Sequence, residues 1–265
     1  RPFGEALGIL MGCVGLRIEQ RATTLTVLPE YLEGASSEAL LERSRRNLVS
    51  TFSAFPNSEV SPLILRAMAR VEEKLGLNDA AEGHLRQLAQ DFPNSDLVPS
   101  ALTHAGQLLQ RSGQWGEAKQ VLSQLCNLPY AHDHYPNGLL ELARCHAELG
   151  EGRQGLRILD ALNAIWPLDK GVDSPAIQAE RLFVHAACLF EAGDAGEALV
   201  LLDKCNELGH RGDLDPKVFP LRARALEAVG RPADAAVAWL ARSRRVEGKE
   251  LQGAALSEAA RLALV

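Results

Sequence analysis

Aromatic residues and positive charge are both scarce in this chain. Only 5% of its 265 residues are Phe, Trp or Tyr, and the formal net charge is −6. Binding to nucleic acid depends on a surplus of Lys and Arg, so we expect no nucleic-acid partner. No run of about 18 apolar residues occurs, so we expect no direct membrane span.

Catalytic and cofactor-binding motifs are missing as well. We find no phosphate-binding glycine loop, GxGxxG or nucleophile elbow in the strand–turn–helix context that such motifs need. The cluster His132-Asp133-His134 resembles part of a metal site, but no further ligands follow at a recognisable spacing. We interpret it as a loop in which Asp133 or His134 begins the helix of Pro136. We therefore predict that the protein is not an enzyme and that it binds no cofactor or metal.

The five cysteines form no CxxC pair. Cys145 and Cys188 each stand five residues before a glycine of the repeat described next, on a predicted buried helix face. Because unpaired cysteine is among the most buried residue types, we expect small core side chains rather than a disulfide framework.

A regular series of glycines is the most informative feature that is present. The spacings are 37, 37, 43 and 37 residues, and a small residue follows five positions after each glycine. Prolines stand fourteen positions before four of them, with Ala179 in the remaining place. The members are Gly76, Gly113, Gly150, Gly193 and Gly230; Ala81, Ala118, Gly155, Ala198 and Ala235; Pro62, Pro99, Pro136 and Pro216. Self-similarity at such a period predicts a repeat protein.

Each repeat is expected to be a hairpin of two helices. Pro99 suits a first helical turn, Gly113 suits a left-handed helix end, and Ala118 begins a second apolar face. The fold class is therefore all-α, an α-α superhelix of five to six hairpins. We expect repeats at 62–95, 99–132, 136–169, 176–212 and 216–249, within a repeat domain of 59–249, and place the six extra residues of the long spacing in a loop at 168–175.

The ends of the chain are expected to differ from the repeats. Residues 1–58 form a predicted helical segment with a partial repeat, in which 37–54 is a second helix, 5–20 its partner and 21–30 an extended connector. Residues 250–265 form a predicted capping helix, or the start of another unit. Because the chain begins at Arg1, we interpret it as a piece of a longer protein.

The pattern of leucine, small residue, glycine, alanine and proline resembles the tetratricopeptide repeat. The best unit matches at Leu65, Met68, Ala69, Gly76, Ala81, Leu85, Leu88 and Pro93. Leucine replaces the usual aromatic residues, and the period of 37 exceeds the usual period of about 34. The resemblance covers residues 62–249. It implies a concave face, lined by the first helix of each hairpin, that binds a partner protein or peptide.

The resemblance also implies which side chains line that face. Arginine can bind a carboxylate with two hydrogen bonds, and exposed aromatic rings are typical anchors. The alternative is that the charges are merely solvated and that the two phenylalanines pack against the next repeat. The implied residues are Arg66, Arg70, Lys74, Gln107, Arg111, Leu140, Arg144, Phe183, Phe190 and Arg224.

A recurring string bears on location. Phe55-Pro56-Asn57-Ser58 and Phe92-Pro93-Asn94-Ser95 lie 37 residues apart and are similar to repeat endings in bacterial envelope proteins. Physically the string is a helix stop, because proline cannot continue a helix. We therefore expect a non-enzymatic interaction scaffold from a larger bacterial protein of the periplasm. The alternative is a cytosolic sensory array in a signalling protein, which the unpaired cysteines favour. No feature predicts an oligomeric state.

Overall fold

The computed structural model describes residues 16–21, 24–29, 36–128, 133–167, 174–208, 215–244 and 249–263. The chain divides into two compact units, each described here by itself. The N-terminal unit comprises residues 1–117 and 127–134, and the C-terminal unit comprises 118–126 and 135–265.

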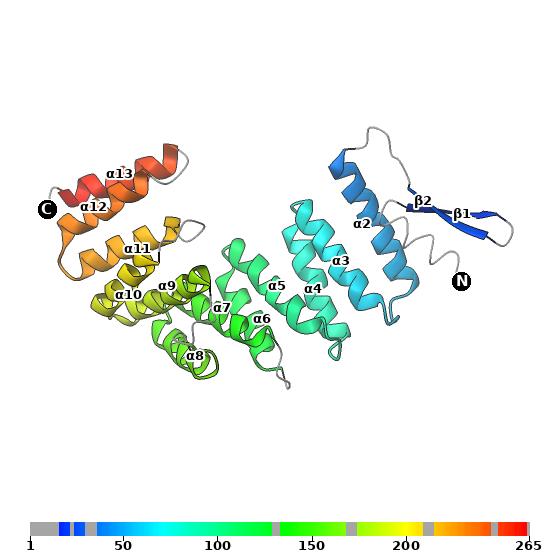
Figure 1. The fold of residues 1–265 in the computed structure, drawn as a ribbon, viewed down its shortest axis with the longest axis horizontal. Coiled ribbons are helices and arrows are strands. Elements are labelled where there is room, and N and C mark those ends of the chain that lie inside the picture. Colours follow the sequence, from blue (N-terminus) through cyan, green and yellow to red (C-terminus); the bar gives the residue numbers. More distant parts are fainter. Residues whose placement is uncertain are drawn as a thin grey trace. The chain divides into compact units, whose positions relative to one another are not determined.

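Apart from one β-hairpin, the described elements are helices, which confirms the predicted fold class (Figure 1). The N-terminal unit contains β1 (Leu16–Arg21), β2 (Thr24–Pro29), α2 (Ser37–Ala54), α3 (Ser61–Lys74), α4 (Asn78–Asp91) and α5 (Val98–Arg111). Helix α6 (Trp115–Cys126) joins the units. The C-terminal unit contains α7 (Tyr135–Glu148), α8 (Gly152–Ile165), α9 (Pro175–Ala192), α10 (Ala195–Glu207), α11 (Asp215–Ala228), α12 (Pro232–Ser243) and α13 (Lys249–Ala263).

The five repeat glycines occupy the left-handed region, with φ between 72° and 100°. Each lies in the turn between the two helices of a hairpin. The residue that follows donates its N–H to the carbonyl five positions earlier, as Leu77 does to Glu72 and Glu151 to His146, at 2.9 and 2.8 Å. This hydrogen bond defines a Schellman motif, in which a left-handed residue satisfies carbonyls at the helix end. The prediction that glycine ends each first helix is confirmed.

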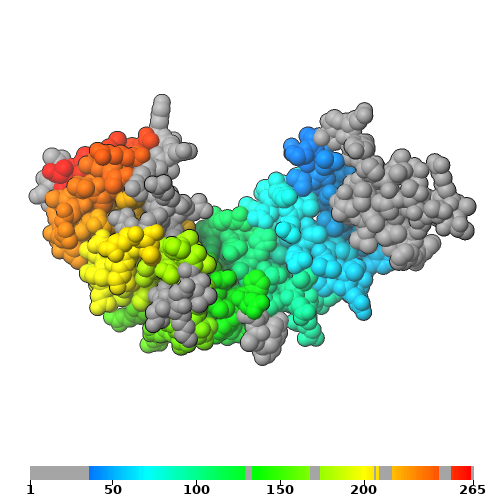
Figure 2. Space-filling view, in the orientation of Figure 1, coloured from blue at the N-terminus to red at the C-terminus, as the bar shows by residue number. Residues whose placement is uncertain are grey.

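Small residues allow the two helices of a hairpin to cross closely. Ala69 and Ala81 are completely buried, as are Ala186 and Ala198. A Cβ atom added to Gly155 would lie 3.2 Å from the carbonyl oxygen of Ala143 and 2.5 Å from Cys188 Sγ. A methyl group is thus too large at this crossing. Consecutive helices of the C-terminal unit pack side by side from α10 to α13 (Figure 1), and their surfaces follow one another from yellow to red in Figure 2.

The irregular repeat differs from the prediction at the start of its first helix. Helix α9 has 18 residues, against 14 in α3, and it begins at Pro175, where Ser174 accepts a hydrogen bond from the N–H of Ile177. Part of the extra length between Gly150 and Gly193 therefore forms an additional helical turn rather than a loop. The other residues assigned to that loop, 168–173, lie outside the described residues.

The N-terminal segment contains a departure from the helical prediction. Leu16–Arg21 and Thr24–Pro29 form an antiparallel hairpin, with Leu16 opposite Pro29 and Arg21 opposite Thr24. The prediction of a helix at 5–20 is therefore wrong for 16–20, and residues 1–15 are not described. Thr24, Thr26 and Val27 are β-branched, which favours a strand. The predicted helix at 37–54 is confirmed as α2, which packs on α3.

A buried carboxylate connects the first three helices. Glu72 of α3 is 0% exposed; its Oε1 accepts a hydrogen bond from Arg45 Nε of α2 at 3.0 Å. Its Oε2 lies 2.7 Å from His84 Nδ1 of α4. Burial of a carboxylate is costly unless it is paired and hydrogen-bonded, and both oxygens of Glu72 are satisfied here.

Helix α13 has the position of a first helix, one repeat after α11. Arg261 Nη2 bonds Glu227 Oε2 of α11 at 2.8 Å, much as Arg224 of α11 bonds Glu191 of α9 at 3.3 Å. Arg224 and Arg261 are 37 residues apart, one repeat. A helix in this place agrees with both predictions for 250–265, a capping helix and the start of another unit.

Apolar side chains form the interior of each unit. Cys145, Cys188 and Cys205 are buried among them, which confirms the predicted position of Cys145 and Cys188. Among the helices that the structure describes, none combines the length and apolarity needed to cross a bilayer.

Candidate functional site

The ten implied partner-binding residues fall into two sets, one in each unit. The N-terminal unit holds Arg66, Arg70 and Lys74 on α3 and Gln107 and Arg111 on α5. The C-terminal unit holds Leu140 and Arg144 on α7, Phe183 and Phe190 on α9, and Arg224 on α11.

Helix α3 presents a basic face to solvent. Arg70 and Lys74 are exposed, Arg66 is half-buried, and the neighbouring Leu63 is 48% exposed. Spacings of three and four residues place these side chains on one side of the helix. Within the described residues, the side chains of Arg66, Arg70 and Lys74 form no ion pair and no hydrogen bond with any other residue. We call Leu63, Arg66, Arg70 and Lys74 the α3 basic face.

Arg111 of α5, by contrast, is engaged by a carboxylate. Its Nη2 donates to Glu73 Oε1 at 2.5 Å, while His104 Nε2 lies 2.8 Å from Glu73 Oε2. The hydrogen bond from Arg111 is the largest cause that lowers the pKa of Glu73 below its ordinary value, despite partial burial. Gln107, one helical turn before Arg111, is exposed.

Arg144 in the C-terminal unit is almost enclosed. Its side chain is 11% exposed, with Nε 3.2 Å from Glu141 Oε2 and Nη2 2.6 Å from Glu180 Oε1 on α9. Burial alone would lower the pKa of Arg144, but the charges of the two glutamates outweigh burial and raise it. Arg144 thus joins α7 to α9 and has little surface left for a partner.

The predicted apolar anchors are not exposed anchors. Leu140 and Phe183 are 4% and 6% exposed and belong to the apolar core of the C-terminal unit. Phe190 is half-buried against that core, and the guanidinium of Arg224 lies 4.6 Å from its ring centre. Leu140 and Phe183 were therefore wrongly predicted to line a binding face, because their helical positions point between repeats. The alternative, packing against the next repeat, describes the phenylalanines better.

Arginines at one repeat position differ in their ion-pair partners. Arg70, Arg144 and Arg224 each stand six residues before a repeat glycine, and Arg261 follows Arg224 by 37 residues, so the four occupy equivalent places. Three of them pair with a glutamate on a neighbouring first helix: Arg144 with Glu180, Arg224 with Glu191 and Arg261 with Glu227. Arg70 is the member of this series without such a pair among the described residues.

No metal site emerges among the described residues, in which no group of three or more His, Cys, Asp or Glu is arranged to hold an ion. Of the predicted metal-like cluster, His132 lies outside the described residues, while Asp133 and His134 form the turn before α7.

Taken together, the left-handed glycine turns and the small-residue crossings define an α-helical repeat protein. No family model and no curated protein matches the chain. Solved structures do match it. One is a tetratricopeptide repeat protein from Parabacteroides merdae, with a TM-score of 0.54, 18% identity, and coverage of 83% of this chain and 78% of that one.

Two further solved structures agree. PilF of Pseudomonas aeruginosa has a TM-score of 0.54 at 15% identity, over 82% of this chain and 90% of that chain. MamA from Desulfovibrio magneticus has a TM-score of 0.52 at 15% identity, over 71% and 97% of the two chains. The protein is thus a tetratricopeptide-repeat-like protein in fold, as its glycine and alanine pattern predicted.

Proposed function

We propose that this protein is a non-enzymatic interaction scaffold whose α3 basic face binds an acidic segment of a protein partner. The observation that carries the proposal is the contrast between Arg70 and its repeat equivalents. Arg144, Arg224 and Arg261 are bound to glutamates, whereas Arg66, Arg70 and Lys74 have no ion pair within the described residues. Three neighbouring cations without a partner in the part of the chain that the structure describes, on a chain of net charge −6, favour a carboxylate-bearing ligand.

Leu63 supplies an apolar contact beside these charges. It is 48% exposed, so burying it under a partner would remove apolar surface from water. An acidic segment with an apolar residue would therefore suit the α3 basic face better than a purely acidic one. Arginine would fix the position of the bound carboxylates, and the apolar contact would add affinity.

A charge reversal on α3 tests the proposal. We compare Arg66→Glu/Arg70→Glu with Arg153→Glu/Arg157→Glu, which makes the same charge change on exposed residues of α8 in the C-terminal unit. The probe is a short labelled peptide of glutamate and leucine, and the measurement is fluorescence anisotropy at low salt. We expect the α3 variant to lose at least about tenfold in affinity, equal to about 1.4 kcal/mol. The α8 variant should lose little.

Salt provides a second check. Because exposed charges are screened over about 8 Å at physiological ionic strength, added salt should weaken binding to the unaltered chain. Equal binding by both charge-reversed variants would contradict the proposal. So would tighter binding of a matched peptide of lysine and leucine.

We further propose that the scaffold belongs to a larger bacterial protein of the cell envelope. The support is the recurring Phe-Pro-Asn-Ser string. Phe55 and Phe92 are the C-cap residues that directly follow α2 and α4 and precede their prolines. The competing proposal, a cytosolic sensory array, is supported by the buried thiols of Cys188 and Cys205, which form no disulfide among the described residues. Cell fractionation of the native protein distinguishes the two: recovery in the periplasmic fraction supports the first and recovery in the cytosolic fraction the second.

A further inference from the structure

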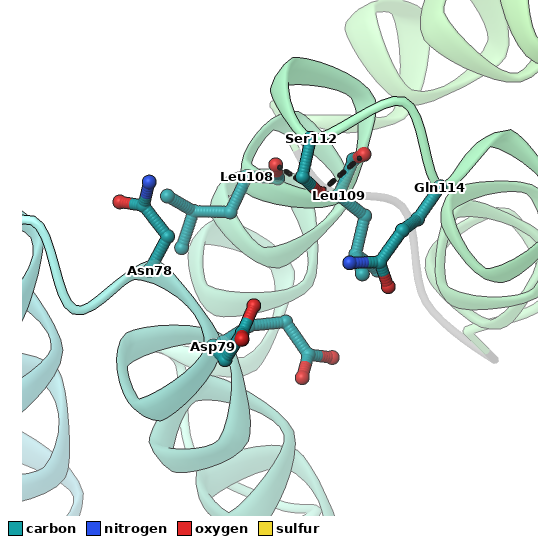
Figure 3. A pocket seen from close by; sticks show the side chains of 7 residues that line it. Asn78, Asp79, Leu108, Leu109, Ser112 and Gln114 are labelled. Carbon is teal, nitrogen blue, oxygen red and sulfur yellow. Dashed lines mark hydrogen bonds between the residues drawn. The ribbon is translucent and has the colours of Figure 1, made fainter.

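A small hollow lies in the N-terminal unit, on the side where the hairpin turns are found. The beginning of α4 and the end of α5 form its walls, and Gln114 completes it (Figure 3). Its volume is about 220 Å³. The lining residues are Asn78, Asp79, Glu82, Leu108, Leu109, Ser112 and Gln114.

The chemistry of this lining favours a cation with an apolar stem. Leu108 and Leu109 are 3% and 4% exposed and form an apolar wall. Oxygen acceptors surround it, among them the carboxylates of Asp79 and Glu82. Ser112 donates its hydroxyl proton to the carbonyls of Leu108 and Leu109, at 3.3 and 3.0 Å, which leaves its oxygen able to accept.

Glu82 is incompletely neutralised within the described residues. Its side chain is 15% exposed, and Arg86 Nη1 lies 3.4 Å from Oε1, at the long end of hydrogen bonding. Burial is the largest influence on its pKa and raises it above the ordinary value, despite the opposing charge of Arg86. A second cation beside Glu82 would offset the cost of burying its charge.

The next repeat shows what fits in this place. Counting 37 residues on, Lys119 takes the position of Glu82, His146 that of Leu109 and Glu151 that of Gln114. Lys119 Nζ lies 2.9 Å from both carboxylate oxygens of Glu151, and His146 Nδ1 lies 2.5 Å from Glu151 Oε2. The same junction of the repeat therefore holds a lysine ammonium in the C-terminal unit. In the N-terminal unit, Glu82 replaces that lysine and a hollow is found.

We propose that the hollow at Asp79, Glu82 and Gln114 binds the ammonium group of a lysine side chain from a protein partner. The stem of that lysine would lie along Leu108 and Leu109, as long charged side chains commonly lie on apolar surface. The volume of about 220 Å³ is below the range of about 300–1,000 Å³ typical of small-molecule sites, which favours a single side chain. A metal ion is disfavoured, because no metal-binding group was found among the described residues.

The site is separate from the α3 basic face and binds the opposite charge. Either proposal can therefore fail without affecting the other.

The test is a titration of the ¹⁵N-labelled chain, followed by amide chemical shifts. The probe is Nα-acetyl-lysine N-methylamide, and the control ligand is the norleucine analogue, which has the same stem without the ammonium. We expect saturable shifts at Leu109, Ser112 and Gln114 with a dissociation constant on the order of millimolar. The norleucine analogue should produce none. Equal shifts with both ligands would overturn the proposal, as would saturation by calcium or magnesium chloride in place of the lysine probe.

Two variants assign the effect to the hollow. Glu82→Gln should weaken lysine binding at least about fivefold, whereas Glu59→Gln, an exposed glutamate outside the lining, should leave it unchanged. Glu82→Lys/Gln114→Glu transfers the Lys119–Glu151 pair into the hollow and should abolish binding while the melting temperature is maintained. Undiminished binding by Glu82→Gln would disprove the assignment, whatever the double variant does.

Discussion

The guanidinium of Arg224 lies 4.6 Å from the ring centre of Phe190, and its Nη2 is 3.3 Å from Glu191 Oε1. Phe190 and Glu191 are neighbours on α9, so one arginine of α11 contacts both an aromatic face and a carboxylate. The aromatic face of Phe190 is thereby covered by a side chain of the protein itself. This contact stabilises the junction of two hairpins.

A double-mutant cycle measures this junction. Phe190→Ala and Arg224→Ala should each lower the free energy of unfolding in urea, and their effects should be non-additive by about 0.5–1 kcal/mol, the usual size of a cation–π contact. Additivity within about 0.3 kcal/mol would show that the two side chains do not interact.

Gly155 should be intolerant of a methyl group. Gly155→Ala places a Cβ 2.5 Å from Cys188 Sγ, and we expect a loss of about 1–3 kcal/mol in the free energy of unfolding. The matched control is Gly83→Ala within α4, where an added Cβ meets nothing within 4 Å. That change should stabilise the protein by up to about 1 kcal/mol, because alanine is the better helix former. Equal effects of the two substitutions would contradict the close crossing.

Removal of the buried carboxylate should loosen α2. Glu72→Ala leaves Arg45 and His84 without their shared partner, and we expect a loss of about 3 kcal/mol or more. Hydrogen exchange should accelerate in α2 before it does in α5. Glu59→Ala, at an exposed position, serves as the control and should change stability by less than about 0.5 kcal/mol. Unchanged exchange in α2 would show that Glu72 does not hold it.

Two glutamates of the N-terminal unit should respond to pH in opposite directions. Burial raises the pKa of Glu82, so ionisation above that pKa costs stability, and Glu82→Gln should raise the melting temperature near neutral pH. The hydrogen bond from Arg111 lowers the pKa of Glu73. Its charged form stabilises the fold above pH 4.5, and this contribution is lost as pH falls through the lowered pKa.

Glu73→Gln should therefore reduce the melting temperature near neutral pH. Both differences from the unaltered chain should shrink well below pH 4.5, where the carboxyls are protonated. Scanning calorimetry across this range provides the measurement. Shifts of the same sign for the two variants would refute the assignment of opposite pKa changes.

Thiols whose pKa is raised by full or partial burial should resist alkylation in the folded protein. Burial raises the pKa of Cys188 and of Cys205 to about 12, and that of Cys126 to about 11, so the reactive thiolate is rare at neutral pH. Mass spectrometry after iodoacetamide treatment should find these three unmodified in the native chain and modified in urea. Rapid labelling of Cys188 under native conditions would contradict its burial.

The periodic part of the fold was predictable because it repeats. Gly76 and its four equivalents must all adopt the same left-handed conformation, and the coincidence of five such positions revealed the period. The β-hairpin at 16–29 has no copy elsewhere to compare with. Its second strand lies within 21–30, which was predicted to be extended, but the pairing of that strand with Leu16–Arg21 was missed. The longer α9 was missed because its proline, Pro175, lies one turn before the position that the other repeats share.

The candidate site was less predictable than the fold, because repeat position does not determine the partner of a side chain. Arg70 and Arg144 have the same spacing from their glycines, yet only Arg144 lies between two glutamates. Glu72 could have been recognised: it follows Leu65 and Ala69 at helical spacing and so belongs to the buried side of α3. The hollow beside Glu82 required knowledge of which loops and helix ends approach one another.

Each glycine turn closes through hydrogen bonds to carbonyls of the helix it ends, such as Gln114 to Leu109 and Arg231 to Leu226. The hydrogen bonds that reverse the chain direction therefore lie within a few residues of each turn and involve no other hairpin. A hairpin can therefore be duplicated or exchanged if its contacts with the two neighbouring hairpins are preserved. The gene can gain whole repeats while the turns of the existing hairpins continue to form as before.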